Sequence, residues 1–123
     1  MVRKPTSARN LKTLLKDLPV KVVGSAPSVR IRGVSADSRK VQPGFAFVAI
    51  KGEHSDGMAY LDQAIANGAA LIVSDRPKPA GLHLPYLQVA GEMSWNLAYL
   101  AAAYHGYPAR KLVMIGVTGT DGK

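Results

Sequence analysis

The stretch Pro43-Gly44-Phe45-Ala46-Phe47-Val48-Ala49-Ile50 decides the fold class of this 123-residue chain. All six residues from Phe45 to Ile50 are apolar, which is typical of a central strand that is buried in a sheet. Pro43-Gly44, directly before them, favours a turn. The stretch therefore predicts a turn followed by an interior strand.

Strand and helix patterns alternate along the rest of the chain. Val29 and Ile31 alternate with arginines, as in a half-buried strand that Gly33 interrupts. Helical spacing predicts a short N-terminal helix capped by Ser7, a helix over 60–67 that Gly68 ends, and a helix from Met93 that ends near Gly106 and Pro108. The expected inner faces are Ala8, Leu11, Leu14 and Leu15; Leu61, Ala64 and Ile65; and Met93, Leu97, Leu100, Ala101 and Tyr104. Strands are also expected at 70–73 and 86–89, with a loop over 76–81. This alternation predicts an α/β fold with a small, mostly parallel or mixed sheet flanked by helices.

The last nine residues, Ile115-Gly116-Val117-Thr118-Gly119-Thr120-Asp121-Gly122-Lys123, follow an expected strand over 112–115. Their three glycines allow backbone N–H groups to converge on phosphate oxygens, and Lys123 adds a point charge. From residue types alone, a glycine-rich loose end is the alternative to a phosphate site. The Ser or Thr that would bind magnesium after such a loop, and the helix that would follow, are not in the sequence. We therefore expect the chain to be a fragment of a longer protein.

Composition limits the class of partner. Sixteen Lys and Arg against eight Asp and Glu give a net charge of +8, which favours an anionic partner. A nucleic acid would fit this charge, but no cluster of aromatic residues accompanies it. The absence of cysteine excludes disulfides and cysteine-ligated zinc. No apolar run approaches the roughly 20 residues of a membrane span, so we expect a cytoplasmic protein without a membrane or nucleic-acid partner.

Two blocks of this sequence resemble the Mur ligases of peptidoglycan synthesis. One is Gly-x-x-Gly-Thr-Asp-Gly-Lys over 116–123; the other runs from Asp37-Ser38-Arg39 through Pro43-Gly44 and the apolar strand to Gly52 and Asp56-Gly57. The similarity covers about residues 30–123 and is greatest to the UDP-N-acetylmuramoyl-tripeptide synthetase branch, the MurE type. Asp121 departs from the pattern, because the family usually has Asn at that position.

The resemblance implies two domains and two sites. Residues 1–108 would form the N-terminal domain that binds UDP-MurNAc-peptide, and 109–123 would begin the central ATPase domain with its first strand and a truncated P-loop. Ala36 and Ser38 would contact the uridine, and Glu53, His54 and Ser55 would close over the nucleotide. The ATP phosphates would be bound by Gly119, Thr120, Asp121, Gly122 and Lys123. From residue types alone, the corner Asp37-Ser38-Arg39 fits a structural turn, with Arg39 paired to a carboxylate, equally well.

The resemblance also implies an activity for the full-length protein. With ATP and Mg²⁺, it would add a third amino acid, L-lysine or meso-diaminopimelate, to UDP-MurNAc-L-Ala-D-Glu through an acyl phosphate, in cell wall biogenesis, cell shape and division. The fragment alone is expected to be a monomer, to hold no catalytic or metal-binding residue and to be inactive. One rival is the D-Ala-D-Ala-adding ligase, whose P-loop more often has Ser in place of Thr120. The other rival is a non-enzymatic module that binds nucleotides or nucleic acid through its basic surface.

Overall fold

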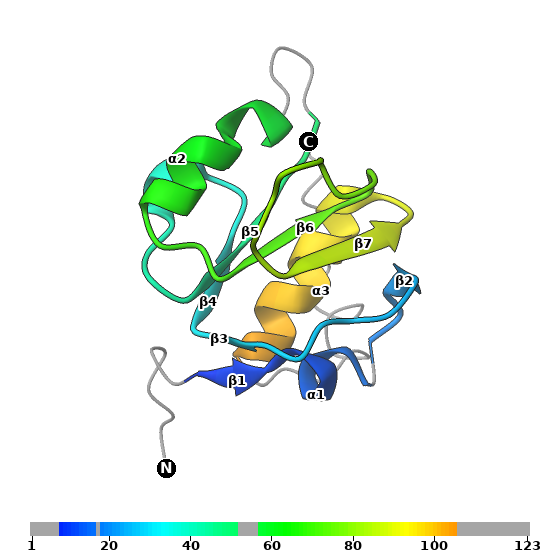
Figure 1. Cartoon of the computed structure of the whole chain (residues 1–123). Helices are drawn as coiled ribbons and strands as arrows, with labels where there is room; N and C mark the ends of the chain where they lie inside the picture. The colour runs from blue at the N-terminus through cyan, green and yellow to red at the C-terminus, as the bar shows by residue number, and fades with distance from the viewer. Residues whose placement is uncertain (1–7, 17, 52–56, 106–123) are drawn as a thin grey trace, which may run out of the picture.

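The computed structural model describes residues 8–16, 18–51 and 57–105 (Figure 1). Its main sheet has five strands in the order β2-β7-β6-β5-β4. All neighbouring pairs are parallel except β2 and β7, which are antiparallel. The strands are β2 (Lys21–Val23), β4 (Gly33–Ser35), β5 (Phe45–Val48), β6 (Leu71–Ser74) and β7 (Tyr86–Ala90). This sheet confirms the predicted mixed, mostly parallel arrangement and places β5 in its interior.

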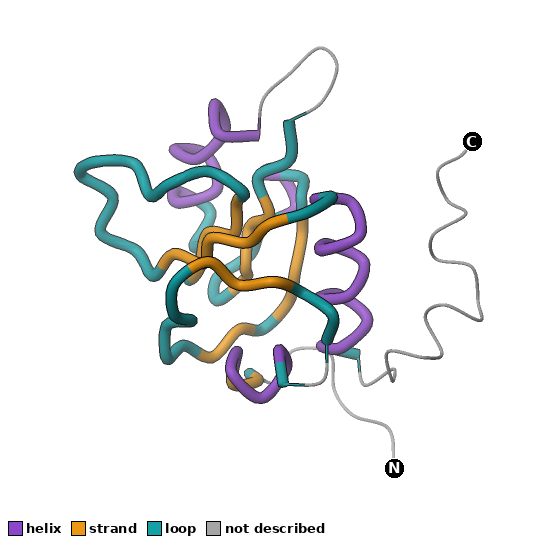
Figure 2. Tube along the Cα trace, turned by 90° about the vertical axis from the view of Figure 1, so that its right-hand side faces the viewer, coloured by secondary structure: helices purple, strands orange, loops and turns teal. Residues whose placement is uncertain are grey.

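Helices cover both faces of the sheet (Figure 2). One face packs against α3 (Met93–Tyr104) and α1 (Leu11–Leu15). The other packs against α2 (Leu61–Ala66), which follows the 3₁₀ turn η2 (Gly57–Tyr60). A second, two-stranded sheet pairs β1 (Arg9–Asn10) with β3 (Arg30–Ile31). Among the described residues, no helix has the length and apolar character needed to cross a bilayer.

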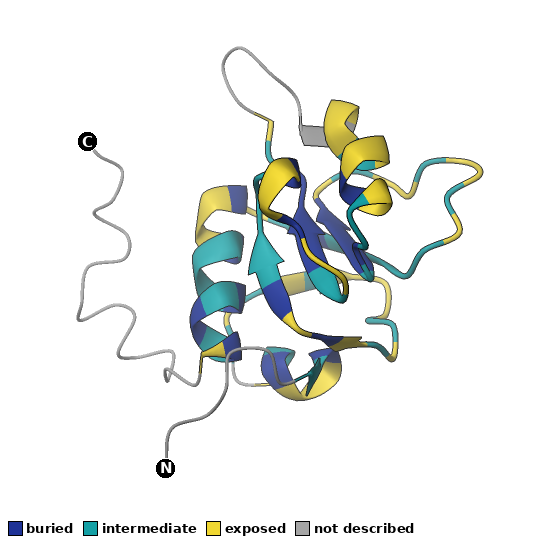
Figure 3. Cartoon of the chain, turned by 90° about the vertical axis from the view of Figure 1, so that its left-hand side faces the viewer, coloured by how far each residue is buried: buried dark blue, intermediate teal, exposed yellow. Residues whose placement is uncertain are grey.

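Alternation along the strands divides the core into two clusters, one on each face. On β5, Ala46 and Val48 belong to the cluster beneath α1 and α3, whereas Phe47 belongs to the cluster beneath α2. On β6, Val73 belongs to the cluster beneath α1 and α3, and Ile72 belongs to the cluster beneath α2. Figure 3 shows these buried strands between helices whose outer surfaces are exposed. A strand with both faces covered needs apolar residues on both faces, which explains the continuous apolar run in the sequence.

The predicted helix over 60–67, the helix from Met93 and the strands at 70–73 and 86–89 are confirmed within one or two residues at each end, whereas the strand expected over 112–115 lies outside the described residues. Residues 76–81 form a loop, as predicted, and α2 ends at the C-cap residue Asn67, directly before Gly68. Ile65, however, is 38% exposed and does not belong to the inner face predicted for it. The buried side of α3 includes the unexpected Asn96, whose Nδ2 donates to the Ala90 carbonyl at 3.2 Å. That bond gives the buried amide a partner and so permits its burial.

The N-terminal predictions need correction. Helix α1 begins at Leu11, so Ala8 precedes it, and Ser7 lies outside the described residues. The N-cap is Asn10, whose side-chain oxygen accepts a hydrogen bond from the Lys12 backbone N–H at 2.9 Å. The half-buried strand expected around Ile31 is β3, and a separate strand that was not expected, β4, begins at Gly33 and belongs to the other sheet.

Candidate functional site

The candidate site lies where the chain leaves the carboxyl end of β4. Because β4, β5, β6 and β7 are parallel, their carboxyl ends meet at one edge of the sheet. Open α/β sheets bind ligands outside this edge, where loops rather than strands supply the side chains. The loop after β4 turns into the 3₁₀ helix η1 (Ser38–Lys40) at this position.

A pocket of about 550 Å³ opens beside this corner. Its size lies within the range of pockets that hold nucleotides and other small ligands. The lining comes from both layers, the corner after β4 and the segment that leads into α2: Ala36, Asp37, Ser38, Arg39, Tyr60 and Gln63. The structure therefore brings Ala36 and Ser38 together in one pocket, and their contact with a uridine stays a prediction.

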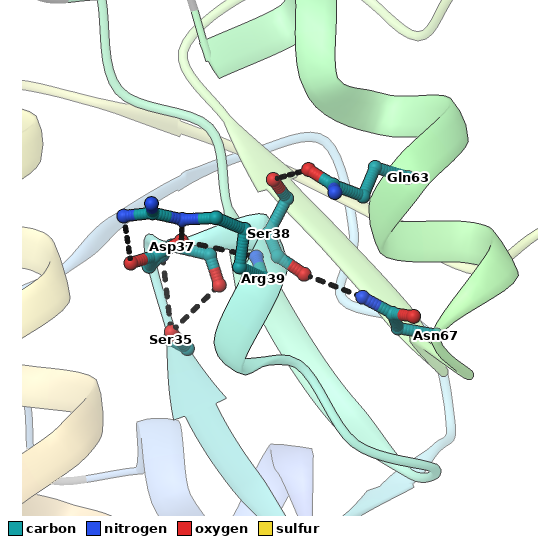
Figure 4. Close-up of polar contacts among 6 residues, drawn as sticks. All are labelled: Ser35, Asp37, Ser38, Arg39, Gln63 and Asn67. Carbon is teal, nitrogen blue, oxygen red and sulfur yellow. Dashed lines mark hydrogen bonds and ion pairs between the residues drawn. The ribbon is translucent and has the colours of Figure 1, made fainter.

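Two hydrogen bonds join Ser38 to α2 and its C-cap residue (Figure 4). Its hydroxyl donates to Gln63 Oε1, and its carbonyl oxygen accepts from Asn67 Nδ2 at 2.9 Å. Gln63 and Asn67 are four residues apart, so both side chains project from the same side of the helix. Ser38 is only 6% exposed. The corner is therefore fixed by side chains that are 25 and 29 residues away in the sequence.

Asp37 and Arg39 form an ion pair within the corner itself. Asp37 Oδ1 accepts from the backbone N–H and from Nε of Arg39, and Oδ2 accepts from Nη2, each at 3.0 Å. The backbone N–H of Asp37 donates in turn to Ser35 Oγ at 3.0 Å. These bonds confirm the expectation that Arg39 pairs with a carboxylate, while the serine that bonds the backbone of the turn is Ser35 and not Ser38. The Arg39 side chain is 78% exposed, so its guanidinium is accessible to an anion at the pocket rim.

Hydrogen bonds from Arg39 lower the pKa of Asp37 below its ordinary value near 3.8, with its side-chain bond as the main cause and its backbone bond next. The same ion pair raises the pKa of Arg39. A lowered carboxyl pKa stabilises the fold above the ordinary value, and this contribution is lost as the pH falls through the folded-state pKa. Because the Arg39 side chain is 78% exposed and that of Asp37 30%, solvent screens the ion pair and the effect on stability is small.

We expect an Arg39→Ala variant to raise the Asp37 pKa toward its ordinary value without fully restoring it, because the variant removes the side-chain hydrogen bond, the main cause of the shift, and keeps the backbone N–H of residue 39, the next cause. An NMR titration of the Asp37 carboxyl carbon measures this directly. Lys40→Ala is the matched control, because Lys40 acts on Asp37 only through a weak Coulombic attraction. If both variants moved the pKa equally, the ion pair would not be its cause.

Three residues on the α2 side of the site, Tyr60, Gln63 and Asn67, were not predicted as site residues. The only signal for them in the sequence is the polar pair Gln63 and Asn67 at helical spacing on the predicted helix 60–67. Such a pair is usually a solvated helix face, and only the fold shows that Ser38 lies opposite it.

Other predicted site residues lie outside the described part of the chain. This holds for the loop expected to close over the nucleotide, Glu53, His54 and Ser55, and for the expected phosphate loop, Gly119, Thr120, Asp121, Gly122 and Lys123. The predicted domain boundary near 108 lies outside it as well. Within residues 8–16, 18–51 and 57–105, no group of three or more His, Asp or Glu side chains could hold a metal ion.

A second, smaller pocket of about 390 Å³ lies at the start of α3 and includes Trp95 and Tyr99. Their rings are tilted, with centroids 5.8 Å apart. Their spacing of four residues places both rings on the same side of α3, which explains the contact. Lys21 of β2 and Glu92 also line this pocket. Because β2 and β4 are the two edge strands of the sheet, this pocket lies at the edge opposite the corner after β4.

Comparison with known proteins identifies the family. The family described as "Mur ligase family, catalytic domain" matches residues 30–105, which include the whole candidate site. This chain belongs to the Mur ligase family. The assignment confirms the resemblance drawn from the corner and strand motifs.

Several Mur ligases are similar to this chain in sequence. A UDP-N-acetylmuramyl-tripeptide synthetase of Roseiflexus sp. is 48% identical over 99 residues, which are 76% of this chain and 18% of that protein. UDP-N-acetylmuramoyl-L-alanyl-D-glutamate–2,6-diaminopimelate ligases are 44% identical in Gloeobacter violaceus, over 79% of this chain and 20% of the relative, and 39% identical in Chlamydia abortus, over 93% and 23%. The chain thus spans about a fifth of the length of these Mur ligases.

Solved structures of another Mur ligase share the fold. A crystal structure of MurF from Acinetobacter baumannii aligns with a TM-score of 0.62 and 27% identity, and the alignment covers 81% of this chain and 21% of that one. A second structure from the same organism has the same TM-score and is titled a UDP-N-acetylmuramoylalanyl-D-glutamyl-2,6-diaminopimelate–D-alanyl-D-alanyl ligase. The α/β arrangement is therefore one that Mur ligases adopt.

Proposed function

We propose that this chain is the UDP-binding domain of a tripeptide-synthetase Mur ligase, and that the pocket beside Ser38 holds the uridine of UDP-MurNAc-L-Ala-D-Glu. The observation that carries the proposal is the pocket itself. It combines Ala36 and Ser38 with a site at the carboxyl edge of a parallel sheet, in a chain 39–48% identical to relatives named for a UDP-MurNAc substrate.

The pocket offers three kinds of contact to a uridine diphosphate. The ring of Tyr60, which is 45% exposed in the lining, provides a face on which a planar base stacks. The polar groups of Ser38 and Gln63 lie in the same lining and can meet the base edge. The exposed guanidinium of Arg39 provides positive charge at the rim for a phosphate. The face of a base, the edge of a base and a phosphate therefore each find a suitable group.

For the whole protein we propose ATP-dependent amide bond formation in the cytoplasm, with L-lysine or meso-diaminopimelate as the added amino acid and Mg²⁺ as the metal. The relatives' names support this reaction class. The residues that would hold the ATP phosphates, Gly119 to Lys123, lie outside the described part of the chain. The proposed role of the described residues is therefore to bind and orient the UDP end of the substrate.

The D-Ala-D-Ala-adding ligase is a second candidate, because the solved structures of MurF align with this fold at a TM-score of 0.62. Its relatives in structure are 27% identical to this chain, whereas the tripeptide-synthetase and diaminopimelate-adding relatives reach 39–48%. The difference in identity favours the first candidate. An extended chain that accepts UDP-MurNAc-tripeptide but not UDP-MurNAc-dipeptide would favour the second.

Calorimetric titration of the 123-residue chain tests the proposal. We expect heat with UDP-MurNAc-L-Ala-D-Glu and with UDP, and a Ser38→Ala variant is expected to bind both about 10-fold more weakly, since it loses a hydroxyl that orients the pocket. Ser28→Ala, at an exposed serine outside the pocket lining, is the matched control and should bind like the wild type. Equal affinity of the Ser38 variant and wild type, or no heat with either ligand, would contradict the proposed site.

A further inference from the structure

The Gln63 amide has one defined orientation at the pocket wall. Its carbonyl oxygen Oε1 accepts the hydroxyl proton of Ser38, so the oxygen side of the amide faces the corner (Figure 4). The other side carries Nε2, with two N–H donors and no acceptor. Within residues 8–16, 18–51 and 57–105, Nε2 donates to no other group. Gln63 lines the pocket, so these donors are available to a ligand there.

Two features hold the corner against α2. Ser38 is buried, and Asn67, one turn after Gln63 on α2, holds its carbonyl at 2.9 Å. Asn67 also forms the C-cap of α2, where its backbone N–H donates to the carbonyl of Gln63 at 3.0 Å. The corner and the helix are therefore held against each other, and a pocket wall that is positioned before binding loses little freedom when a ligand binds.

We propose that Gln63 is the residue that selects uracil over cytosine, by donating from Nε2 to the carbonyl at position 4 of the pyrimidine. The inference rests on the proposed function, in which the pocket holds a uridine. Uracil presents an acceptor at that position, whereas cytosine presents an amino group. Two donors that face each other leave both unpaired, and this mismatch rejects the wrong base.

A comparison of UDP with CDP tests the inference on the full 123-residue chain. The wild type is expected to prefer UDP by about 10-fold to 100-fold, the penalty for one unpaired group in a partly buried site. In Gln63→Glu, the carboxylate still accepts the Ser38 hydroxyl proton but offers an acceptor to the base, so the ratio of UDP to CDP affinity should fall at least 10-fold. Gln63→Ala should bring the ratio close to one.

Control variants separate base selection from structural and charge effects. Gln42→Glu makes the same charge change at an exposed glutamine before β5, outside the pocket, and should leave the ratio unchanged. Ser38→Ala frees the Gln63 amide to rotate, so it should lower the ratio while keeping Gln63 in place. Circular dichroism shows whether each variant is folded; Gln63 is exposed on α2, so its substitution is expected to leave the fold intact.

The outcomes distinguish this inference from the function on which it rests. A wild type that binds neither nucleotide overturns both. A wild type that binds UDP, with Gln63→Glu weakening UDP and CDP by the same factor, overturns the role of Gln63 and leaves the uridine pocket standing. A fall in the UDP to CDP ratio in Gln63→Glu and Gln63→Ala, with Gln42→Glu unchanged, supports it.

Discussion

A Gly68→Ala variant is expected to lose about 3 kcal/mol of unfolding free energy, because two penalties act at one residue. Gly68 has φ +103°, a conformation that residues with a side chain rarely adopt. An added Cβ would also lie 2.6 Å from Pro43 Cα, which is backbone and cannot rotate away. Two hydrogen bonds hold the glycine there, from its N–H to the Ile65 carbonyl at 3.0 Å and from the Gly44 N–H to its own carbonyl at 2.9 Å.

Urea unfolding measures the loss, and Gly81→Ala isolates the clash. Gly81 has φ +85°, but no atom lies within 4 Å of the position of an added Cβ. Its substitution should therefore cost only the conformational penalty, about 1 kcal/mol. A similar loss in both variants would show that the turn before β5 moves away from the added methyl group at little cost.

The sequence predicts Gly68 correctly as the end of a helix, because its signals are local. The apolar residues of α2 recur at helical spacing, and a glycine follows them. The contact with Pro43 is not local, since the fold must first bring the end of α2 against the turn before β5. The same limit explains why β1 and β2 were not predicted. Each has only two or three residues and contains a basic side chain, so neither carries a pattern of its own.

The candidate site also has a part that local sequence predicts and a part that depends on the fold. Asp37, Ser38 and Arg39 are adjacent in sequence, and the residue types that stabilise such a turn predict both the corner and its ion pair. Gln63 and Asn67 reach the corner only because the fold packs α2 beside η1, the turn that follows β4. A hydrogen bond between residues 25 positions apart leaves no periodic trace in the sequence. The residues that orient the site therefore had to come from the structure.

The corner can be both a structural turn and part of the proposed uridine pocket. The two interpretations are compatible, because different side chains have the two roles. Asp37 and Arg39 stabilise the turn through each other, while the Ser38 hydroxyl is joined to α2. The pocket wall on α2 is thus coupled to the packing of that helix on the sheet. Loss of packing beneath α2 should then affect both stability and the site.

Phe47→Ala is expected to destabilise the domain by about 3–5 kcal/mol, a large part of the 5–15 kcal/mol typical of a small protein. Phe47 is 1% exposed and is the largest buried side chain in the cluster beneath α2. Its ring packs with Ala64 of α2 and with Ile72 of β6, so its removal leaves a cavity between the helix and the sheet. Small neighbours such as Ala49 cannot fill that space.

Phe45→Ala provides the matched comparison, since Phe45 lies on the same strand and the same face but is only partly buried. We expect it to cost about 1–2 kcal/mol, because part of its ring already contacts water. Urea unfolding of the two variants gives the stability difference, and UDP titration below the unfolding transition shows whether the site on α2 weakens with it. A larger loss for Phe45→Ala than for Phe47→Ala would mean that the turn before β5, rather than the packing beneath α2, dominates the stability of this layer.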